Sequence, residues 1–280
     1  MIKLNEKEVR VEHYPDGTQK IILDRYPIYN SVTITWKFEK EEELSTLIYL
    51  VSHIKNRPYA QKVVLYLPYF PNARMDRIHN CCEVFTLKSF ADVINWLNFD
   101  AVKVLDIHSN VGAALLNNAI ICSPEGYITK AIKRIQEEFE SEDDKQNIIL
   151  YFPDAGAAKR YSDLLSGMPY CYGEKKRDWE TGKITGLDIR TNGIDLTGKD
   201  VFMADDIITY GGSMYYSALE LQKHKVNKIY AYATHTENSV LDKDKGTLIK
   251  LLEDGTVERL FTTDSLFNKT HEKIEVMKVL

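Results

Sequence analysis

Five short apolar runs limit the fold of this chain more than any other feature of its sequence. Each run is continuous rather than alternating, which is typical of a strand buried on both faces of a parallel sheet. Helical patterns lie between the runs, and strands that alternate with helices indicate a parallel α/β sheet. The runs cover residues 62–67, 102–107, 147–152, 201–204 and 228–233, and the helical patterns cover 41–55, 86–97, 127–139, 157–165 and 214–224.

The first part of the chain follows a different pattern. Between Glu8 and Phe38 apolar residues alternate with polar ones, for example at Val9 and Val11. Alternation of period two predicts antiparallel strands throughout this segment, and Tyr14-Pro15-Asp16-Gly17 predicts a turn between them.

One internal repeat divides the sequence into two halves. Leu65-Tyr66-Leu67-Pro68 is matched by Leu150-Tyr151-Phe152-Pro153, and each is followed by alanine and a basic residue. Ser123-Pro124-Glu125-Gly126 interrupts the pattern between the halves. We therefore expect two related α/β domains, covering residues 1–124 and 125–280.

Composition argues against several classes of function. The net charge is −5, whereas broad nucleic-acid binding needs a basic face, so no nucleic-acid partner is expected. We find no apolar stretch of about 18 residues that would span a membrane and no charged-then-apolar leader after Met1. The four cysteines, Cys81, Cys82, Cys122 and Cys171, lack metal-site spacing. A cytoplasmic protein with reduced thiols and no membrane partner is expected.

Polar side chains follow four of the apolar runs. Asp106 and His108 follow the second run, Asp154 follows the third, and Asp205 with Asp206 follows the fourth. The fifth run leads to Thr234 and His235. Ligands of parallel sheets bind beyond the carboxyl ends of the strands, so these side chains mark the expected site.

The segment from Val201 to Ser213 carries the strongest signal. Its apolar strand leads to Asp205 and Asp206, and a Gly-Gly-Ser turn then opens a helix. Glycines let backbone amides approach an anion, and a helix N-terminus favours negative charge. The two aspartates can accept hydrogen bonds from ribose hydroxyls or hold a hard cation through water. The segment fits a site for ribose that bears a phosphate; an acidic helix cap with a tight turn is the alternative explanation.

This segment resembles the phosphoribosyl-pyrophosphate-binding motif of type I phosphoribosyltransferases and of ribose-phosphate pyrophosphokinases (PRPP synthetases). Seven further segments resemble motifs of the pyrophosphokinases, and their order is preserved over nearly the whole chain. They are Tyr14-Pro15-Asp16-Gly17, Asn72-Ala73-Arg74-Met75-Asp76-Arg77, Asp106-Ile107-His108, Pro153-Asp154-Ala155-Gly156, Glu174-Lys175-Lys176-Arg177, and the late pair Thr234-His235 with Thr262-Thr263-Asp264-Ser265.

The resemblance implies two tandem phosphoribosyltransferase-like domains and a cytoplasmic homo-oligomer. It also implies a Mg²⁺-dependent enzyme that transfers the β,γ-pyrophosphoryl group of ATP to the anomeric hydroxyl of a ribose 5-phosphate moiety. Lys175 and Arg177, in a mobile loop, would be catalytic; His108 and Asp154 would place Mg²⁺. ATP would be bound by Tyr14, Asp16, Arg74, Asp76 and Arg77, and the ribose phosphate by Asp205, Asp206, Thr209, Tyr210, Gly211, Gly212 and Ser213.

Three departures from the family pattern qualify this reading. The family's opening strand and helix are missing before Glu8. Thr18 and Met75 stand where the family has Glu and Gln at its ATP motifs. Thr209 and Tyr210 replace Asp and Thr in the loop expected to hold the 5-phosphate.

The last departure suggests a larger acceptor. Tyr210 places a ring where the family closes on a phosphate monoester, and a ring can stack on a base or make room for a bridged phosphate. One hypothesis is therefore a divergent, phage-type member that uses ADP-ribose in NAD metabolism instead of ribose 5-phosphate.

Two other classes of function stay open. A phosphoribosyltransferase shares the acidic pair and the glycine loop but would not need the segment from Asn72 to Arg77. A non-catalytic regulatory relative would keep the fold but would typically lose catalytic residues, and Lys175 and Arg177 are both present.

Overall fold

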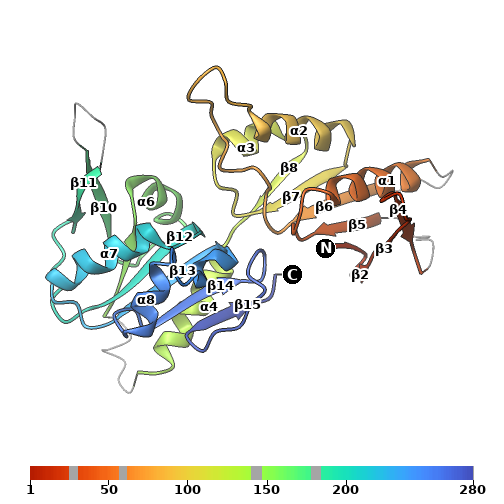
Figure 1. Ribbon diagram of the computed structural model, residues 1–280. Helices are drawn as coiled ribbons and strands as arrows, with labels where there is room; N and C mark the ends of the chain where they lie inside the picture. The colour runs from red at the N-terminus through yellow and green to blue at the C-terminus, as the bar shows by residue number, and fades with distance from the viewer. Residues whose placement is uncertain (25–30, 57–61, 140–146, 178–183, 280) are drawn as a thin grey trace. The chain divides into compact units, whose positions relative to one another are not determined.

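The structure is a computed structural model that describes residues 1–24, 31–56, 62–139, 147–177 and 184–279, with the backbone alone at 175–177 and 184–185. The chain forms two compact units, Met1–Ser123 and Pro124–Leu280. Each unit is built around a mainly parallel sheet with flanking helices, which confirms the predicted α/β class (Figure 1).

The first unit is built on a six-stranded sheet in the order β2-β1-β5-β6-β7-β8. Strands β5 to β8 are parallel to one another, and β1 is antiparallel to β2 and β5. A separate antiparallel hairpin joins β3 and β4. The elements are β1 Ile2–Leu4, β2 Lys7–Glu8, β3 Arg10–His13, β4 Gln19–Ile22, β5 Ser31–Trp36, α1 Glu43–Lys55, β6 Lys62–Leu67, α2 Thr86–Trp96, β7 Ala101–Leu105, α3 Asn110–Leu115 and β8 Ala119–Cys122.

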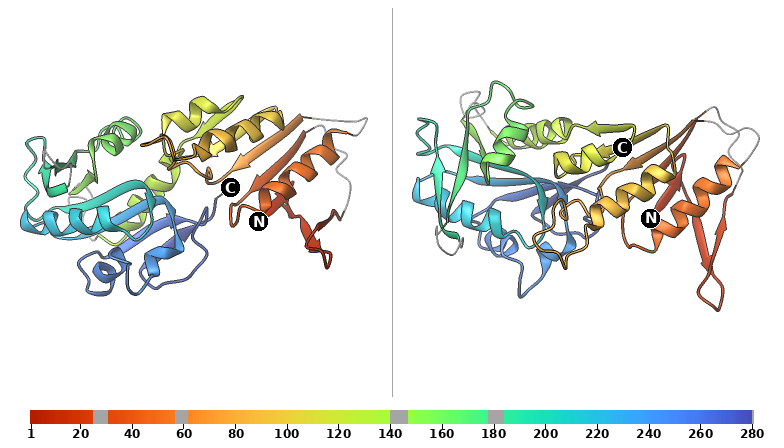
Figure 2. Two further views of the ribbon diagram at one scale, coloured as in Figure 1. Left: turned by 45° about the horizontal axis from the view of Figure 1, so that its top comes forward. Right: turned by 90° about the horizontal axis from the view of Figure 1, so that it is seen from above.

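The core of the first unit lies between the sheet and helices α1 and α2. Alternate residues of β5 and β6, such as Ile34 and Leu65, are fully buried there against Leu47 of α1 and Ile94 of α2. Both helices pack on this one face of the sheet (Figure 2).

The second unit is built on a seven-stranded sheet in the order β11-β10-β9-β12-β13-β14-β15. Its ladders are parallel except for the β10–β11 pair. The elements are α4 Glu125–Gln136, β9 Ile148–Phe152, α6 Ala155–Tyr161, β10 Tyr170–Arg177, β11 Ile184–Arg190, β12 Asp200–Ile208, α7 Gly212–Lys223, β13 Ile229–Thr236, the 3₁₀ helix η1 Asn238–Leu241, α8 Leu248–Glu253, β14 Arg259–Thr263 and β15 Ile274–Met277.

Helices cover both faces of the second sheet (Figures 1 and 2). One face packs against α4 and α6, where Phe152 stacks on Tyr161. The other face packs against α7 and α8, where Met203 meets Ala218 and Leu248. Burial on both faces explains why β9 and the first half of β12 are continuous apolar runs.

Four predictions about local structure are wrong. Strand β5 does not continue an antiparallel segment but pairs in parallel with β6. A strand does lie before Glu8, since β1 pairs with β5, whereas no helix precedes α1 in the described residues. Strand β12 continues to Ile208, so the acidic pair lies inside it and not after it. Residues 174–177, expected in a mobile loop, form the end of strand β10.

The predicted hairpin agrees with the structure. Strands β3 and β4 pair antiparallel around residues 14–18, as the turn signal predicted. All four cysteines are free thiols, and burial raises the pKa of Cys171 to about 12. Across the described ranges no helix has the length and apolar character needed to cross a membrane.

Candidate active site

The acidic pair lies where β12 extends beyond the end of its neighbour β9. The ladder between these strands ends at Met203 opposite Tyr151, whereas β12 continues beside β13 to Ile208. Asp205 and Asp206 therefore occupy a stretch of β12 that has β13 on one side only.

This position is also the point at which the chain reverses its direction across the sheet. From β9 the chain passes through α6 to β10 on one side, and from β12 it passes through α7 to β13 on the other. Because α6 and α7 pack on opposite faces, the carboxyl ends of β9 and β12 are not covered by a crossing helix. Such switch points are where open α/β sheets bind ligands.

The two aspartates differ in exposure, since Asp205 is half-buried and Asp206 is buried. Asp206 is 5 % exposed, and its backbone N–H donates to Asp205 Oδ1 at 2.9 Å. Burial raises the pKa of Asp205 well above its ordinary value, and the neighbouring charge of Asp206 raises it further. A site that keeps two acidic groups this close has a strong demand for hydrogen-bond donors or positive charge.

Arg160 of α6 supplies part of that charge. Its Nη1 lies 3.2 Å from Asp206 Oδ2, and its side chain is 31 % exposed. The contact joins the helix after β9 to the acidic strand, so it crosses the switch point. Arg160 was not among the residues predicted from the sequence to form the site.

Asp154 lies directly after β9 and caps α6. Its Oδ1 accepts hydrogen bonds from the N–H groups of Gly156 and Ala157, both at 3.0 Å. The charge of Asp154 also contributes to raising the pKa of Asp205, after burial and Asp206. The structure therefore brings Asp154 into the same region as the acidic pair and gives it a structural role as a helix cap.

The predicted phosphate loop, residues 209–213, follows β12 and leads into α7. Gly211 has the left-handed conformation, with φ +89°, and Gly212 is the first residue of the helix. Ser213 is exposed, Tyr210 is 36 % exposed, and Thr209 Oγ1 lies 3.5 Å from Glu237 Oε1. The backbone amides at the start of α7 therefore follow the acidic strand in the chain after only a short loop.

In the first unit, the predicted ATP segment and the predicted metal ligand meet. Arg77 makes a two-pronged ion pair with Asp76, with Nε–Oδ1 at 2.8 Å and Nη2–Oδ2 at 3.2 Å. Arg77 is the main cause of the lowered pKa of Asp76, and His108 and Ser109 also lower it. His108 is half-buried after β7, and Arg74 is exposed.

The predicted adenine contacts lie at the tip of the β3–β4 hairpin. Tyr14 is 53 % exposed. Asp16 Oδ1 accepts from the backbone N–H and hydroxyl of Thr18 at 2.9 and 2.7 Å, and these bonds lower the pKa of Asp16. Thr18 thus holds the turn in place of the glutamate expected at this position.

Two predicted residues fall outside the described side chains. Lys175 and Arg177 belong to β10 by their backbone, and Lys175 lies opposite Leu187 in the β10–β11 ladder. Gly173, just before them, packs so tightly that a Cβ would lie 2.5 Å from the Tyr151 hydroxyl. The start of this hairpin is therefore fixed to the end of β9.

The late motifs form a buried polar network. His235 is 2 % exposed, and its Nδ1 lies 2.8 Å from Ser265 Oγ. Thr263 Oγ1 donates to the Thr234 carbonyl at 2.6 Å. These bonds satisfy polar groups between β13 and β14, which gives the segment a structural role.

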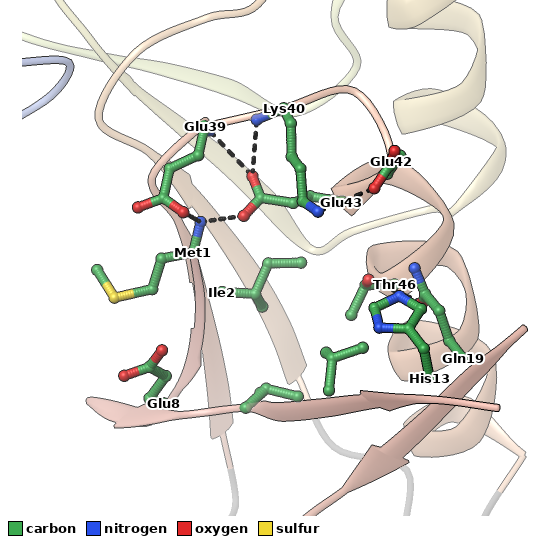
Figure 3. Close-up of a pocket in the computed structure, with 12 residues that line it drawn as sticks. Met1, Ile2, Glu8, His13, Gln19, Glu39, Lys40, Glu42, Glu43 and Thr46 are labelled. Atoms are coloured by element: carbon green, nitrogen blue, oxygen red, sulfur yellow. Dashed lines mark hydrogen bonds and ion pairs between the residues drawn. The ribbon is translucent and has the colours of Figure 1, made fainter. Parts of the chain in front are cut away.

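A pocket of about 300 Å³ in the first unit contains none of the predicted residues (Figure 3). Its lining includes Glu39, Glu42, Glu43 and His13. Glu43 accepts hydrogen bonds from Trp36 Nε1 at 2.8 Å and from the Glu39 N–H at 3.0 Å. The acidic lining thus serves to fix the start of α1.

Comparisons with known proteins find similar ribose-phosphate pyrophosphokinases. No family model matches the chain. A ribose-phosphate pyrophosphokinase of Sulfurisphaera tokodaii is 25% identical over 92% of this chain and 85% of its own length. Another, from Pyrococcus furiosus, is 29% identical over 81% of this chain and 77% of its own length. A phosphoribosylpyrophosphate synthetase from Mycobacterium smegmatis shares the fold, with a TM-score of 0.73 at 19% identity over 97% of this chain and 86% of its own.

Proposed function

We propose that this chain, a divergent relative of the ribose-phosphate pyrophosphokinases, binds the ribose of its acceptor at Asp205 and Asp206. The chain is an ATP-dependent diphosphotransferase of that kind, and its relatives match it over most of their length. The observation that supports this proposal is the acidic pair at the switch point, followed by a glycine loop and the first turn of α7. This order provides acceptors for ribose hydroxyls and, next to them, donors for a phosphate.

The reaction needs no nucleophile from the protein. The anomeric oxygen of the ribose attacks the β-phosphorus of ATP, the bond between that phosphorus and the α,β-bridging oxygen breaks, and AMP leaves. The hydroxyl proton passes to solvent. Catalysis of such a transfer depends on positioning and on charge. Lys175 and Arg177 would supply positive charge to the transferred group, and Arg74 would hold the phosphates of ATP.

Magnesium is part of the proposal. When bound, Mg²⁺ would neutralise charge on the ATP phosphates. It usually binds one or two carboxylates together with substrate phosphates and water. Asp154 fits this demand, because it supplies a carboxylate near the acidic pair. His108 is the weaker donor, since Mg²⁺ prefers oxygen ligands. Within the described ranges no group of three acidic, histidine or cysteine side chains is placed to hold a metal ion.

The acceptor is the open part of the proposal, and product analysis tests it. ATP and Mg²⁺ are offered with ribose 5-phosphate or with ADP-ribose in separate reactions, and the products are identified by mass spectrometry. AMP with pyrophosphorylated ribose 5-phosphate identifies an ordinary PRPP synthetase. AMP with pyrophosphorylated ADP-ribose identifies the larger acceptor and a role in NAD metabolism. If AMP is released with neither ribose 5-phosphate nor ADP-ribose, the proposed function is contradicted.

Replacing Arg160 with glutamine tests the charge balance at the acidic pair. Loss of the contact to buried Asp206 is expected to lower the free energy of unfolding by about 1–3 kcal/mol and kcat/KM by about tenfold. Urea unfolding and steady-state kinetics measure the two effects. Lys159→Gln, at the exposed neighbouring position, is the matched control. An Arg160 variant that behaves like the Lys159 variant would show that the contact is incidental.

A further inference from the structure

The backbone of the phosphate loop is fixed to the start of α8. The Tyr210 carbonyl accepts hydrogen bonds from the Thr247 N–H at 2.8 Å, the Thr247 hydroxyl at 3.0 Å and the Leu248 N–H at 3.3 Å. Three donors on one carbonyl hold this peptide in a single orientation. The backbone that carries the Tyr210 side chain is therefore fixed, and the Tyr210 ring is 36 % exposed.

The connection between β13 and α8 runs beside this loop. The Glu237 N–H donates to the Ile208 carbonyl at 2.8 Å, so the connection begins alongside the end of β12. It then turns tightly, because Asp242 Oδ1 accepts from the N–H groups of Asp244 and Lys245 at 2.9 and 2.8 Å. This turn directs the connection back to the loop.

The turn places an ammonium group over the Tyr210 ring. Lys245 Nζ lies 5.9 Å from the ring centroid, and Lys245 is exposed. A contact of this kind at an exposed site is worth only about 0.5–1 kcal/mol, so folding alone gives little reason for it. Both groups remain accessible to a ligand that extends past the phosphate loop.

We infer that Lys245 and Tyr210 form a subsite for the part of the acceptor that lies beyond its 5-phosphate. The occupant is a nucleoside phosphate joined to ribose 5-phosphate through a pyrophosphate bridge, as in ADP-ribose. Lys245 pairs with the second phosphate, and the Tyr210 ring provides a surface for the nucleoside. This inference rests on the proposed function, because it assumes that ribose 5-phosphate occupies the neighbouring loop.

The test compares acceptors in a single set of variants. Steady-state kinetics with ribose 5-phosphate and with ADP-ribose are measured for the wild type, Lys245→Ala, Tyr210→Ala and the control Lys243→Ala. Lys243 is an exposed lysine of the same connection. Losing one charge-assisted contact is expected to lower the ratio of kcat/KM for ADP-ribose to that for ribose 5-phosphate by about tenfold. Calorimetric titration with ADP-ribose should show weaker binding to the Lys245 and Tyr210 variants and unchanged binding to the Lys243 variant.

The outcomes separate the two proposals. A selective loss with ADP-ribose in the Lys245 variant, together with weaker calorimetric binding of ADP-ribose to the Tyr210 variant, supports the subsite. Equal losses with both acceptors in the Lys245 variant, losses shared by the Lys243 variant, or a wild type that uses ribose 5-phosphate alone would overturn it and leave the pyrophosphokinase proposal intact. A folded wild type that releases AMP with neither acceptor would instead refute the proposed function itself.

Discussion

Asp205→Asn is expected to give a protein that is more stable near neutral pH and much less active. Burial disfavours the charged form of Asp205, and the charge of Asp206 disfavours it further, so the pKa of Asp205 is raised. Asparagine keeps the shape without the charge. Two charge-assisted hydrogen bonds to ribose hydroxyls would be weakened, which lowers kcat/KM by about 100-fold. Thermal unfolding and steady-state kinetics on one preparation measure both effects.

The pH dependence of this variant follows from the direction of the shift. A raised pKa means that the folded wild type binds more protons than the unfolded chain, between the ordinary and the raised pKa of Asp205. Its stability therefore falls as the pH rises through that interval. The gain in Tm from Asp205→Asn should be largest at pH values above the raised pKa of Asp205. It should vanish at pH values below the ordinary pKa of aspartate.

A matched aspartate makes this result decisive. Asp163 is exposed in the same unit, so Asp163→Asn should change neither Tm nor kcat/KM appreciably. If Asp205→Asn retained full activity, the acidic pair would not bind the ribose. If its Tm stayed at or below that of the wild type at every pH, the charge of Asp205 would not be a source of instability.

The sequence predicts the strands and helices of this fold well because its apolar runs reflect burial on both faces. Val201 to Ala204 and Ile148 to Phe152 are fully buried, so their strand character is visible locally. The direction of β5 is not visible in this way, because alternation at Val32, Ile34 and Trp36 reports one buried face and not the partner strand. Parallel pairing with β6 depends on the helix that connects the two strands.

The candidate site was predictable where its residues follow one another and not where it depends on contacts between distant segments. Asp205, Asp206 and the glycine loop are contiguous, so their chemistry can be read from the order of the residues. Arg160 contacts Asp206 and Lys245 lies over Tyr210, in both cases from another part of the chain. No local pattern marks either residue, because each acts only through the topology of the sheet.

Gly211→Ala is expected to be the most destabilising single substitution in the phosphate loop. Gly211 has φ +89°, which costs a residue with a Cβ about 1–3 kcal/mol. The added Cβ would also lie 2.3 Å from Leu248 Cβ and 3.0 Å from its backbone nitrogen, and such overpacking costs about 1–3 kcal/mol more. The free energy of unfolding, measured in urea, should fall by about 2–6 kcal/mol, with weaker binding of the acceptor.

Two other glycines of the same unit separate the two costs. Gly255 also has a positive φ, +82°, but a Cβ there would meet nothing within 4 Å, so Gly255→Ala measures the backbone strain alone. Gly212 has neither a positive φ nor a close neighbour, so the stability of Gly212→Ala should stay near that of the wild type. The difference between the Gly211 and Gly255 variants then gives the cost of the contact with Leu248. Equal stabilities for these two variants would mean that α8 can move away from the loop, and α8 would then not hold Tyr210 in the fixed position that the nucleotide subsite requires.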